Sequence, residues 1–134
     1  MQFKISARIP VVLVAALFTA AMLAEEQKPT AAQAKLPKLL DLGSKHCIPC
    51  KMMAPILEEL KKEYAGQFDV EFVDVNEKEN APIAEKYGID TIPTQIFLDA
   101  NGKELFRHVG FFPKEKILEK WKELKYRFSK QAPK

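Results

Sequence analysis

The stretch from Asp41 to Pro55 decides how the rest of this sequence is interpreted, and it reads DLGSKHCIPCKMMAP. A short apolar run at 37–42 predicts a strand, and apolar residues then recur at three- and four-residue steps, which predicts a helix. Cys47 and Cys50 lie where the strand gives way to the helix. They are the two cysteines of the chain, so this is not a domain stapled by several disulfides, and the pair is free for chemistry.

The position of the two cysteines predicts a redox-active pair. The start of a helix presents unpaired N–H groups and the positive end of the helix dipole, and both stabilise a thiolate. We therefore expect Cys47 to be the nucleophile. Cys50 follows by about one helical turn, close enough to form a disulfide with Cys47 and to resolve a mixed disulfide formed on it.

Three other interpretations of the pair compete with this one. A zinc site needs about four ligands, and only His46 and His108 could join the two sulfurs. A c-type haem needs a histidine directly after the second cysteine, where this chain has Lys51. Two ordinary buried cysteines remain an alternative, although an Ile-Pro dipeptide between them is not typical of a core. We expect no metal and no cofactor.

Further elements follow the predicted helix, which Gly66 should stop. Alternation predicts a strand at 68–75, and Asn80, Pro82 and Gly88 mark the cap, first turn and end of a short helix. Two strands, 94–98 and 104–109, flank a turn and form a hairpin, and a helix over 114–128 closes the domain. The helix between the first two strands predicts that they are parallel, with a right-handed crossover.

The sequence resembles the thioredoxin family. The resemblance rests on the segment from Asp41 to Pro55, on Tyr87-Gly88-Ile89, on Ile92-Pro93-Thr94 and on Val109-Gly110, and it covers about residues 36–126. It implies an α/β thioredoxin fold, a four-stranded mixed sheet in the order β-α-β-α-β-β-α with helices on both faces. It also implies a thiol–disulfide oxidoreductase that acts on client proteins with disulfides.

The resemblance implies roles for single residues. Asp41 matches the buried acid that takes and returns the proton of Cys50. Pro93 matches a cis-proline beside the disulfide, and the substrate-binding set would be Ile48, Pro49, Ile92, Pro93 and Gly110. Asp41 could instead make a local backbone bond, Pro93 could be a plain strand-start proline, and Gly110 could be a turn glycine.

The chain departs from the family pattern at three positions. His46 and Gly43 replace two tryptophans, and Phe72 replaces the lysine that faces the buried acid, so desolvation should raise the pKa of Asp41. The family's first strand and helix should be absent. His46 either supports the Cys47 thiolate or is a plain loop residue. Phe111 and Phe112 could extend an apolar substrate platform, with at least one of them in the core.

The N-terminus predicts export. Lys4 and Arg8 precede an apolar run at 9–23, so residues 1–24 are either a cleaved signal peptide or a membrane anchor. Residues 25–36 would be a linker, 37–128 the thioredoxin-like domain and 129–134 a C-terminal tail. We therefore expect a periplasmic or otherwise extracytoplasmic protein.

The formal net charge of +3 argues against a nucleic-acid binder, because Lys and Arg alternate with Glu along the predicted helices. Proline before the second cysteine resembles reducing thioredoxins, so we expect a monomeric reductase of protein disulfides that draws electrons from a membrane-embedded thiol donor. The alternatives are a disulfide-forming oxidase or isomerase, and a non-catalytic binding module.

Overall fold

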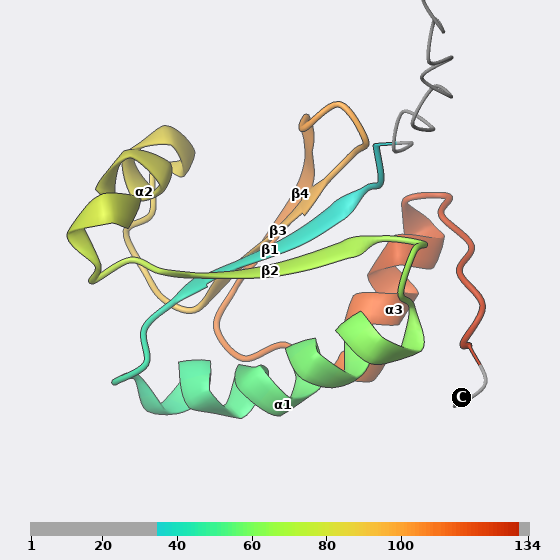
Figure 1. Ribbon diagram of the computed structural model, residues 1–134, viewed down its shortest axis with the longest axis horizontal. Coiled ribbons are helices and arrows are strands. Elements are labelled where there is room, and N and C mark those ends of the chain that lie inside the picture. Colours follow the sequence, from blue (N-terminus) through green and yellow to red (C-terminus); the bar gives the residue numbers. More distant parts are fainter. Residues whose placement is uncertain (1–34, 132–134) are drawn as a thin grey trace, which may run out of the picture. The chain divides into compact units, whose positions relative to one another are not determined.

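The computed structural model describes residues 35–131, which belong to one compact unit. Its elements are β1 (Lys38–Gly43), α1 (Ile48–Glu63), β2 (Asp69–Asp74), a 3₁₀ turn η1 (Lys78–Asn80), α2 (Ala81–Tyr87), β3 (Thr94–Leu98), β4 (Glu104–Val109) and α3 (Lys114–Glu123) (Figure 1). The predicted signal or anchor (1–24), most of the linker (25–36) and the end of the tail (132–134) lie outside the described residues. So does the segment that would carry an additional first strand and helix.

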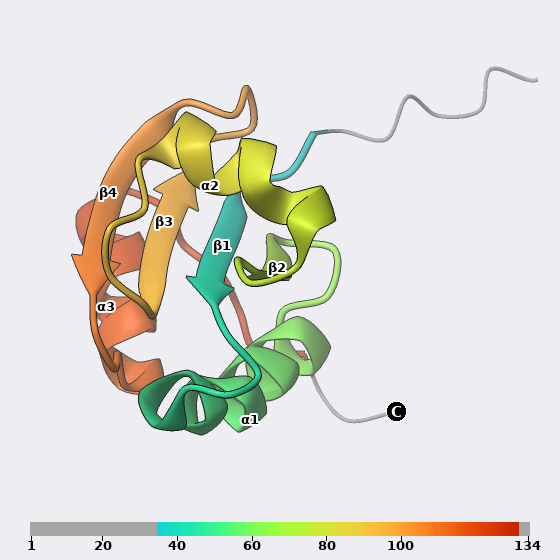
Figure 2. The same ribbon diagram turned by 90° about the vertical axis from the view of Figure 1, so that its left-hand side faces the viewer.

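The four strands form one mixed sheet in the order β2-β1-β3-β4 (Figure 2). β1 and β2 are parallel, with α1 as the crossover between them. β3 runs antiparallel to both β1 and β4. The predicted order and the predicted strand directions are confirmed. Every strand end lies within one residue of the expected one.

Helices cover both faces of the sheet, as expected (Figure 1). Odd-numbered residues of β1 face α1 and α3, where Leu39 packs in a cluster with Met53 and Trp121. Even-numbered residues face α2, where Leu40 and Ile83 share a second cluster. This alternation follows from the two-residue period of a strand. It means that Asp41 lies on the α1 side of the sheet.

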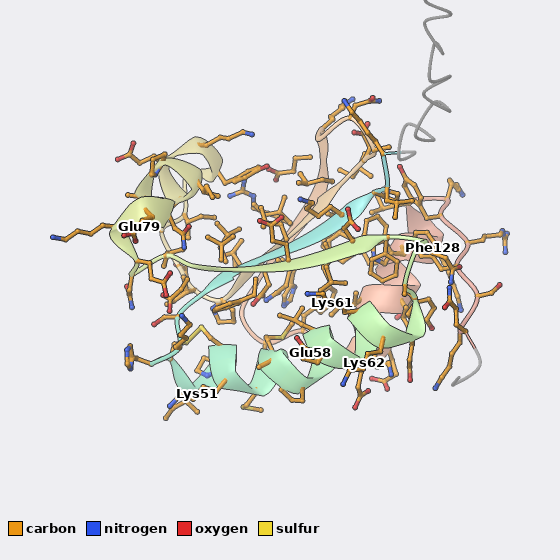
Figure 3. The ribbon with its side chains drawn as sticks, viewed as in Figure 1. Lys51, Glu58, Lys61, Lys62, Glu79 and Phe128 are labelled. Carbon is orange, nitrogen blue, oxygen red and sulfur yellow. A yellow bond between two sulfur atoms is a disulfide. The ribbon has the colours of Figure 1, made fainter. Side chains whose placement is uncertain are left out.

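Helix α1 buries one stripe of side chains against the sheet, including Met53, Leu57 and Leu60. Lys61 and Lys62 lie in its last turn, where cations interact favourably with the helix dipole. These lysines and the neighbouring glutamate Glu58 are exposed, as the interleaved charges predict (Figure 3). The helix thus presents its first turn, with the two cysteines, at one end of the sheet.

The last helix is shorter than predicted. It ends at Glu123, and Lys125 adopts a left-handed conformation with φ of 71°. The N–H of Tyr126 donates to the carbonyl of Trp121, which closes the helix end with a backbone turn. The chain then reverses, so that Phe128 packs 4.7 Å from the ring of Phe68, between ring centroids. The apolar residues up to Phe128 are therefore partly buried because the chain turns back onto the core, and not because the helix continues.

Asn80 also differs from expectation. It precedes α2, but its side chain makes no cap hydrogen bond and donates instead to the carbonyl of Asp74. Gly88 does end α2, in the left-handed conformation, as predicted. Asn80 consequently ties α2 to the end of β2 near the active-site loop.

Candidate active site

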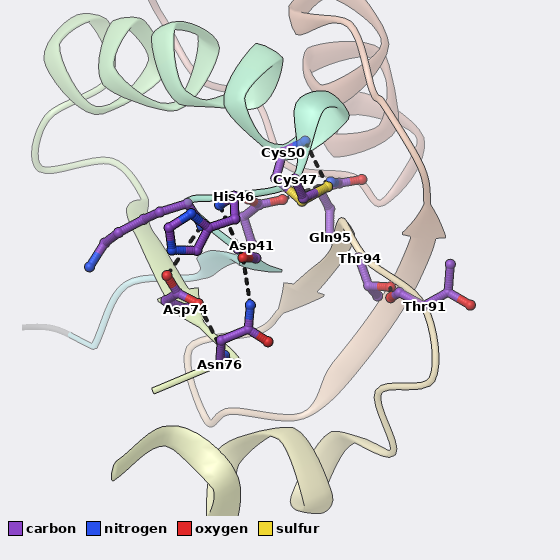
Figure 4. The surroundings of a disulfide bond; sticks show 11 residues. Asp41, His46, Cys47, Cys50, Asp74, Asn76, Thr91, Thr94 and Gln95 are labelled. Atoms are coloured by element: carbon purple, nitrogen blue, oxygen red, sulfur yellow. Dashed lines mark hydrogen bonds between the residues drawn. A yellow bond between two sulfur atoms is a disulfide. The ribbon is translucent and has the colours of Figure 1, made fainter. Parts of the chain in front are cut away.

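Cys47 and Cys50 form a disulfide at the start of α1, with their Cα atoms 5.2 Å apart (Figure 4). Cys47 is the N-cap residue, and the N–H of Cys50 points at its sulfur over 3.4 Å. No acidic residue lies in the first turn of α1 to offset the dipole. Cys47 is partly exposed and Cys50 is buried. These positions fit an attacking Cys47 and a shielded, resolving Cys50.

The loop that delivers Cys47 is braced by side chains that the sequence did not single out. Ser44 Oγ accepts hydrogen bonds from Asn76 Nδ2 at 2.7 Å and from the N–H of His46 at 3.1 Å. The carboxylate of Asp74 accepts from the N–H groups of Asn76 and Lys45. The bond from Asn76 is the main reason that the pKa of Asp74 lies below its ordinary value. His46 itself is exposed in this loop.

Asp41 is fully buried on β1. Burial raises the pKa of its carboxyl group to about 6, opposed by a hydrogen bond from Gln95. Gln95 Nε2 donates to Asp41 Oδ1 over 2.7 Å. The uncharged Phe72 is the β2 partner of Asp41 in the sheet register. The expected rise of the pKa is thus found, while Gln95, its neutral partner on β3, was missed.

Gly43 connects the buried acid to the disulfide. A Cβ atom at position 43 would lie 3.2 Å from Cys50 Sγ, so this face of β1 points at the resolving cysteine. Asp41 lies two residues earlier on the same face. A two-residue step along a strand is about 6.6 Å. That distance lets a side chain reach the thiol directly or through one water, the range that proton transfer requires.

Ile92, Pro93 and Gly110 lie at the same end of the sheet as the disulfide. The Ile92–Pro93 bond is cis, as the resemblance implies. The carbonyl of Pro93 accepts a hydrogen bond of 2.8 Å from the N–H of Gly110, whose φ is 99°. Gly110 therefore needs its glycine conformation and also secures the proline loop. The structure brings these residues together, and their role toward a substrate stays a prediction.

Apolar side chains rim the disulfide. Ile48 is 75% exposed, and Met52, Val109 and Phe111 are exposed by 39–52%. Phe112, by contrast, is buried and stacks on His108 with ring centroids 4.0 Å apart. Of the two phenylalanines, one is core and one is surface, as expected. Met52 and Val109 were not predicted members of this rim.

A cleft of about 280 Å³ adjoins Cys50 and is also lined by Ala54, Leu57 and Phe72. Residues 35–131 hold no group of three or more His, Cys, Asp and Glu side chains that could bind a metal ion. In the same range, no helix combines the length and apolar character needed to cross a membrane.

Comparison with known proteins identifies the relatives of this chain. The family model for thioredoxin matches residues 19–123. Thioredoxins of Staphylococcus epidermidis and Staphylococcus aureus are 44% and 43% identical over 82 residues, which are 61% of this chain and 76% of each relative.

Solved structures give the same fold. The crystal structure of oxidised thioredoxin O2 from Arabidopsis thaliana has a TM-score of 0.58 at 22% identity, covering 69% of this chain and 77% of that one. The structure of a malarial protein has a TM-score of 0.60 at 25% identity, covering 66% and 96%.

Proposed function

Because this chain belongs to the thioredoxin family and is a thiol–disulfide oxidoreductase, we propose that it reduces protein disulfides outside the cytoplasm. The observation that carries the reaction is the Cys47–Cys50 disulfide at the start of α1, with Asp41 buried behind it. An insulin reduction assay with dithiothreitol tests turnover. A chain that binds client proteins without accelerating this reaction would be a binding module instead.

The reduction proceeds in two exchanges. The Cys47 thiolate attacks one sulfur of the client disulfide, forms a mixed disulfide and releases the other client sulfur as a thiolate. Asp41 then takes the proton of Cys50, whose sulfur attacks Cys47. The second client thiolate leaves, and the protein is oxidised to the disulfide seen here. Two electrons pass to the client, whose thiolates take up protons.

The direction of exchange depends on the reduction potential. Pro49 precedes the second cysteine as in reducing thioredoxins, whereas disulfide-forming relatives more often have histidine there. A potential near that of thioredoxin, about −270 mV, would support the reductase. A value near the roughly −120 mV of strong periplasmic oxidants would establish the oxidase or isomerase alternative.

Export is supported by Lys4, Arg8 and the apolar run at 9–23. A fusion of residues 1–36 to a reporter that is active only outside the cytoplasm should be active. The matched control is residues 25–36 alone on the same reporter, which should be silent. A silent but stably expressed 1–36 fusion would refute the proposed location.

An extracytoplasmic reductase needs electrons that cross the membrane, so we infer a membrane-embedded thiol donor as partner. In the variant Cys50→Ser, Cys47 should be trapped in mixed disulfides with client proteins and with this donor. The absence of any membrane protein among the trapped species would count against the donor. We also expect a monomer, which light scattering of the purified chain tests.

A further inference from the structure

Asp41 and Gln95 share one hydrogen bond and each keep one buried oxygen without a partner. Gln95 Nε2 donates to Asp41 Oδ1, while Asp41 Oδ2 and Gln95 Oε1 accept no bond. Both side chains are fully buried. An unpartnered buried acceptor is costly, so a hydrogen-bonded pair in which each side chain keeps one such oxygen calls for an explanation.

The pair occupies the middle of a row across the sheet. Phe72 of β2 is the register partner of Asp41, and Gln95 of β3 is its partner on the other side. His108 of β4 is in turn the partner of Gln95. From α1 the ionisable group brought to this face is Cys50. Within the described residues, burial and Gln95 account for the shift of the Asp41 pKa, with no charged neighbour contributing.

Both unpartnered oxygens are acceptors, so a single proton would satisfy both. A carboxylic acid and a primary amide can close a ring of two hydrogen bonds, because each offers one donor and one acceptor. The first of these bonds, from Gln95 Nε2 to Asp41 Oδ1, is already present at 2.7 Å. The second needs a hydrogen on Asp41 Oδ2, pointing at Gln95 Oε1.

We propose that Gln95 is the positioning residue for the proton that Asp41 takes from Cys50, held between Asp41 Oδ2 and Gln95 Oε1. This rests on the proposed role of Asp41 in the second exchange. Cys50 loses its proton to Asp41 as its sulfur bonds to Cys47 and the client thiolate leaves. Gln95 neither gains nor loses a proton, and its amide is neutral throughout. It therefore orients the acid without competing for the proton, as a lysine or histidine would.

The first test observes the pair directly by NMR. In the oxidised full-length chain the two cysteines do not titrate. The variant His108→Gln also removes the histidine of this row, so in that background the signals near the row report on Asp41. The side-chain amide of Gln95 should shift with pH at the same midpoint as the Asp41 carboxyl carbon. A Gln95 amide that stays unchanged while Asp41 titrates would overturn the proposal. This result does not depend on whether the protein acts as reductase or oxidase.

The second test measures the resolving step, the attack of Cys50 on a mixed disulfide at Cys47, across pH. Among residues 35–131, Gln95 is the one donor to the Asp41 carboxylate, and Gln95→Leu removes it. The acid limb of the pH profile should therefore move to higher pH, and the rate at neutral pH should fall roughly tenfold. Gln95→Glu makes two carboxyl groups share one proton, which should move the limb up by more than about one pH unit.

The control is Ile96→Val, the next residue of β3, which faces the opposite side of the sheet and loses one buried methylene. Its pH profile should match the parent protein. A purely space-filling Gln95 would leave the profile of Gln95→Leu unchanged, and that outcome would refute the positioning role. If Gln95→Leu does not fold, Gln95→Glu takes its place. Identical pH profiles of the resolving step in Gln95→Glu and in the parent protein would then refute the positioning role.

Discussion

Gly43 lies directly against Cys50, so that a Cβ atom at position 43 would stand 3.2 Å from the Cys50 sulfur and 3.0 Å from Cε2 of Phe72. The two neighbours differ in their freedom to move. Phe72 is 40% exposed, and its ring can turn toward solvent. Cys50 is buried and held by both α1 and the disulfide. The glycine therefore leaves room for the closed disulfide.

We predict that Gly43→Ala destabilises the oxidised protein more than the reduced one. Overpacking a site of this kind costs about 1–3 kcal/mol, and the reduced Cys50 side chain can rotate away. Urea unfolding of both redox forms measures the difference. A double-mutant cycle with Phe72→Ala separates the two contacts. If Gly43→Ala no longer destabilises the oxidised protein in the Phe72→Ala background, the steric clash is with the Phe72 ring and not with the disulfide.

The two thiols of the reduced protein should react at very different rates. Cys47 is partly exposed at the N-terminus of α1, whereas only 3% of Cys50 is exposed. We expect iodoacetamide to modify Cys47 much faster than Cys50 at neutral pH. Mass spectrometry of timed samples identifies the modified residue. Equal rates, or a faster Cys50, would contradict the assignment of the nucleophile.

The hydrogen bonds to Ser44 Oγ, which brace the loop before Cys47, should affect the attack of Cys47 on the client disulfide. Asn76→Ala removes the 2.7 Å bond to Ser44 Oγ, which also accepts from the N–H of His46. We expect a loss of about 1 kcal/mol in unfolding free energy and a several-fold slower attack by Cys47. Asn101→Ala, in the exposed turn at the far end of the sheet, is the control. An unchanged rate with lowered stability would show that the brace is structural only.

Much of the architecture could be predicted because it depends on local patterns. The period of the apolar residues and the position of Gly88 predicted the four strands and the helix α2 to within one residue at each end. The end of the last helix could not be predicted, because Leu124 and Phe128 keep the helical spacing. They are instead buried by a chain reversal at Lys125, which depends on the aromatic rings of Phe68 and Trp121.

The sequence predicted the site residues that belong to a recognisable motif. It did not predict the residues that contact them from a neighbouring strand. The cysteine pair, the buried acid and the proline loop follow from their sequence neighbours. Gln95 lies 54 residues from Asp41 in the chain, and Asn76 lies 32 residues from Ser44, so no local pattern pairs them. Only the register of the sheet, which pairs Asp41 with Gln95, reveals that a neutral amide stands beside the acid.

The stability of the protein should depend on pH through Asp41. Its pKa is about 6 in the fold, against 3.8 for the ordinary group. Below about pH 4 both the folded and the unfolded chain are protonated, so the buried carboxyl group carries no ionisation penalty. Between pH 4 and 6 the unfolded chain releases its proton first, and the free energy of unfolding falls as pH rises. Above pH 6 the full penalty, about 3 kcal/mol at most, is present.

Asp41→Asn removes that penalty and keeps the shape. Its amide could also donate to Gln95 Oε1, which now has no partner. We predict that the variant is more stable than the parent by about 2–3 kcal/mol at pH 7.5 and about equally stable at pH 4. The oxidised forms are compared by urea unfolding, so that thiol ionisation does not contribute. Stopped-flow kinetics should show a slower attack by Cys50, with little change in the attack by Cys47. A stability difference that stays constant between pH 4 and 7.5 would mean that Asp41 does not titrate in this range, and the proton of Cys50 would need another acceptor.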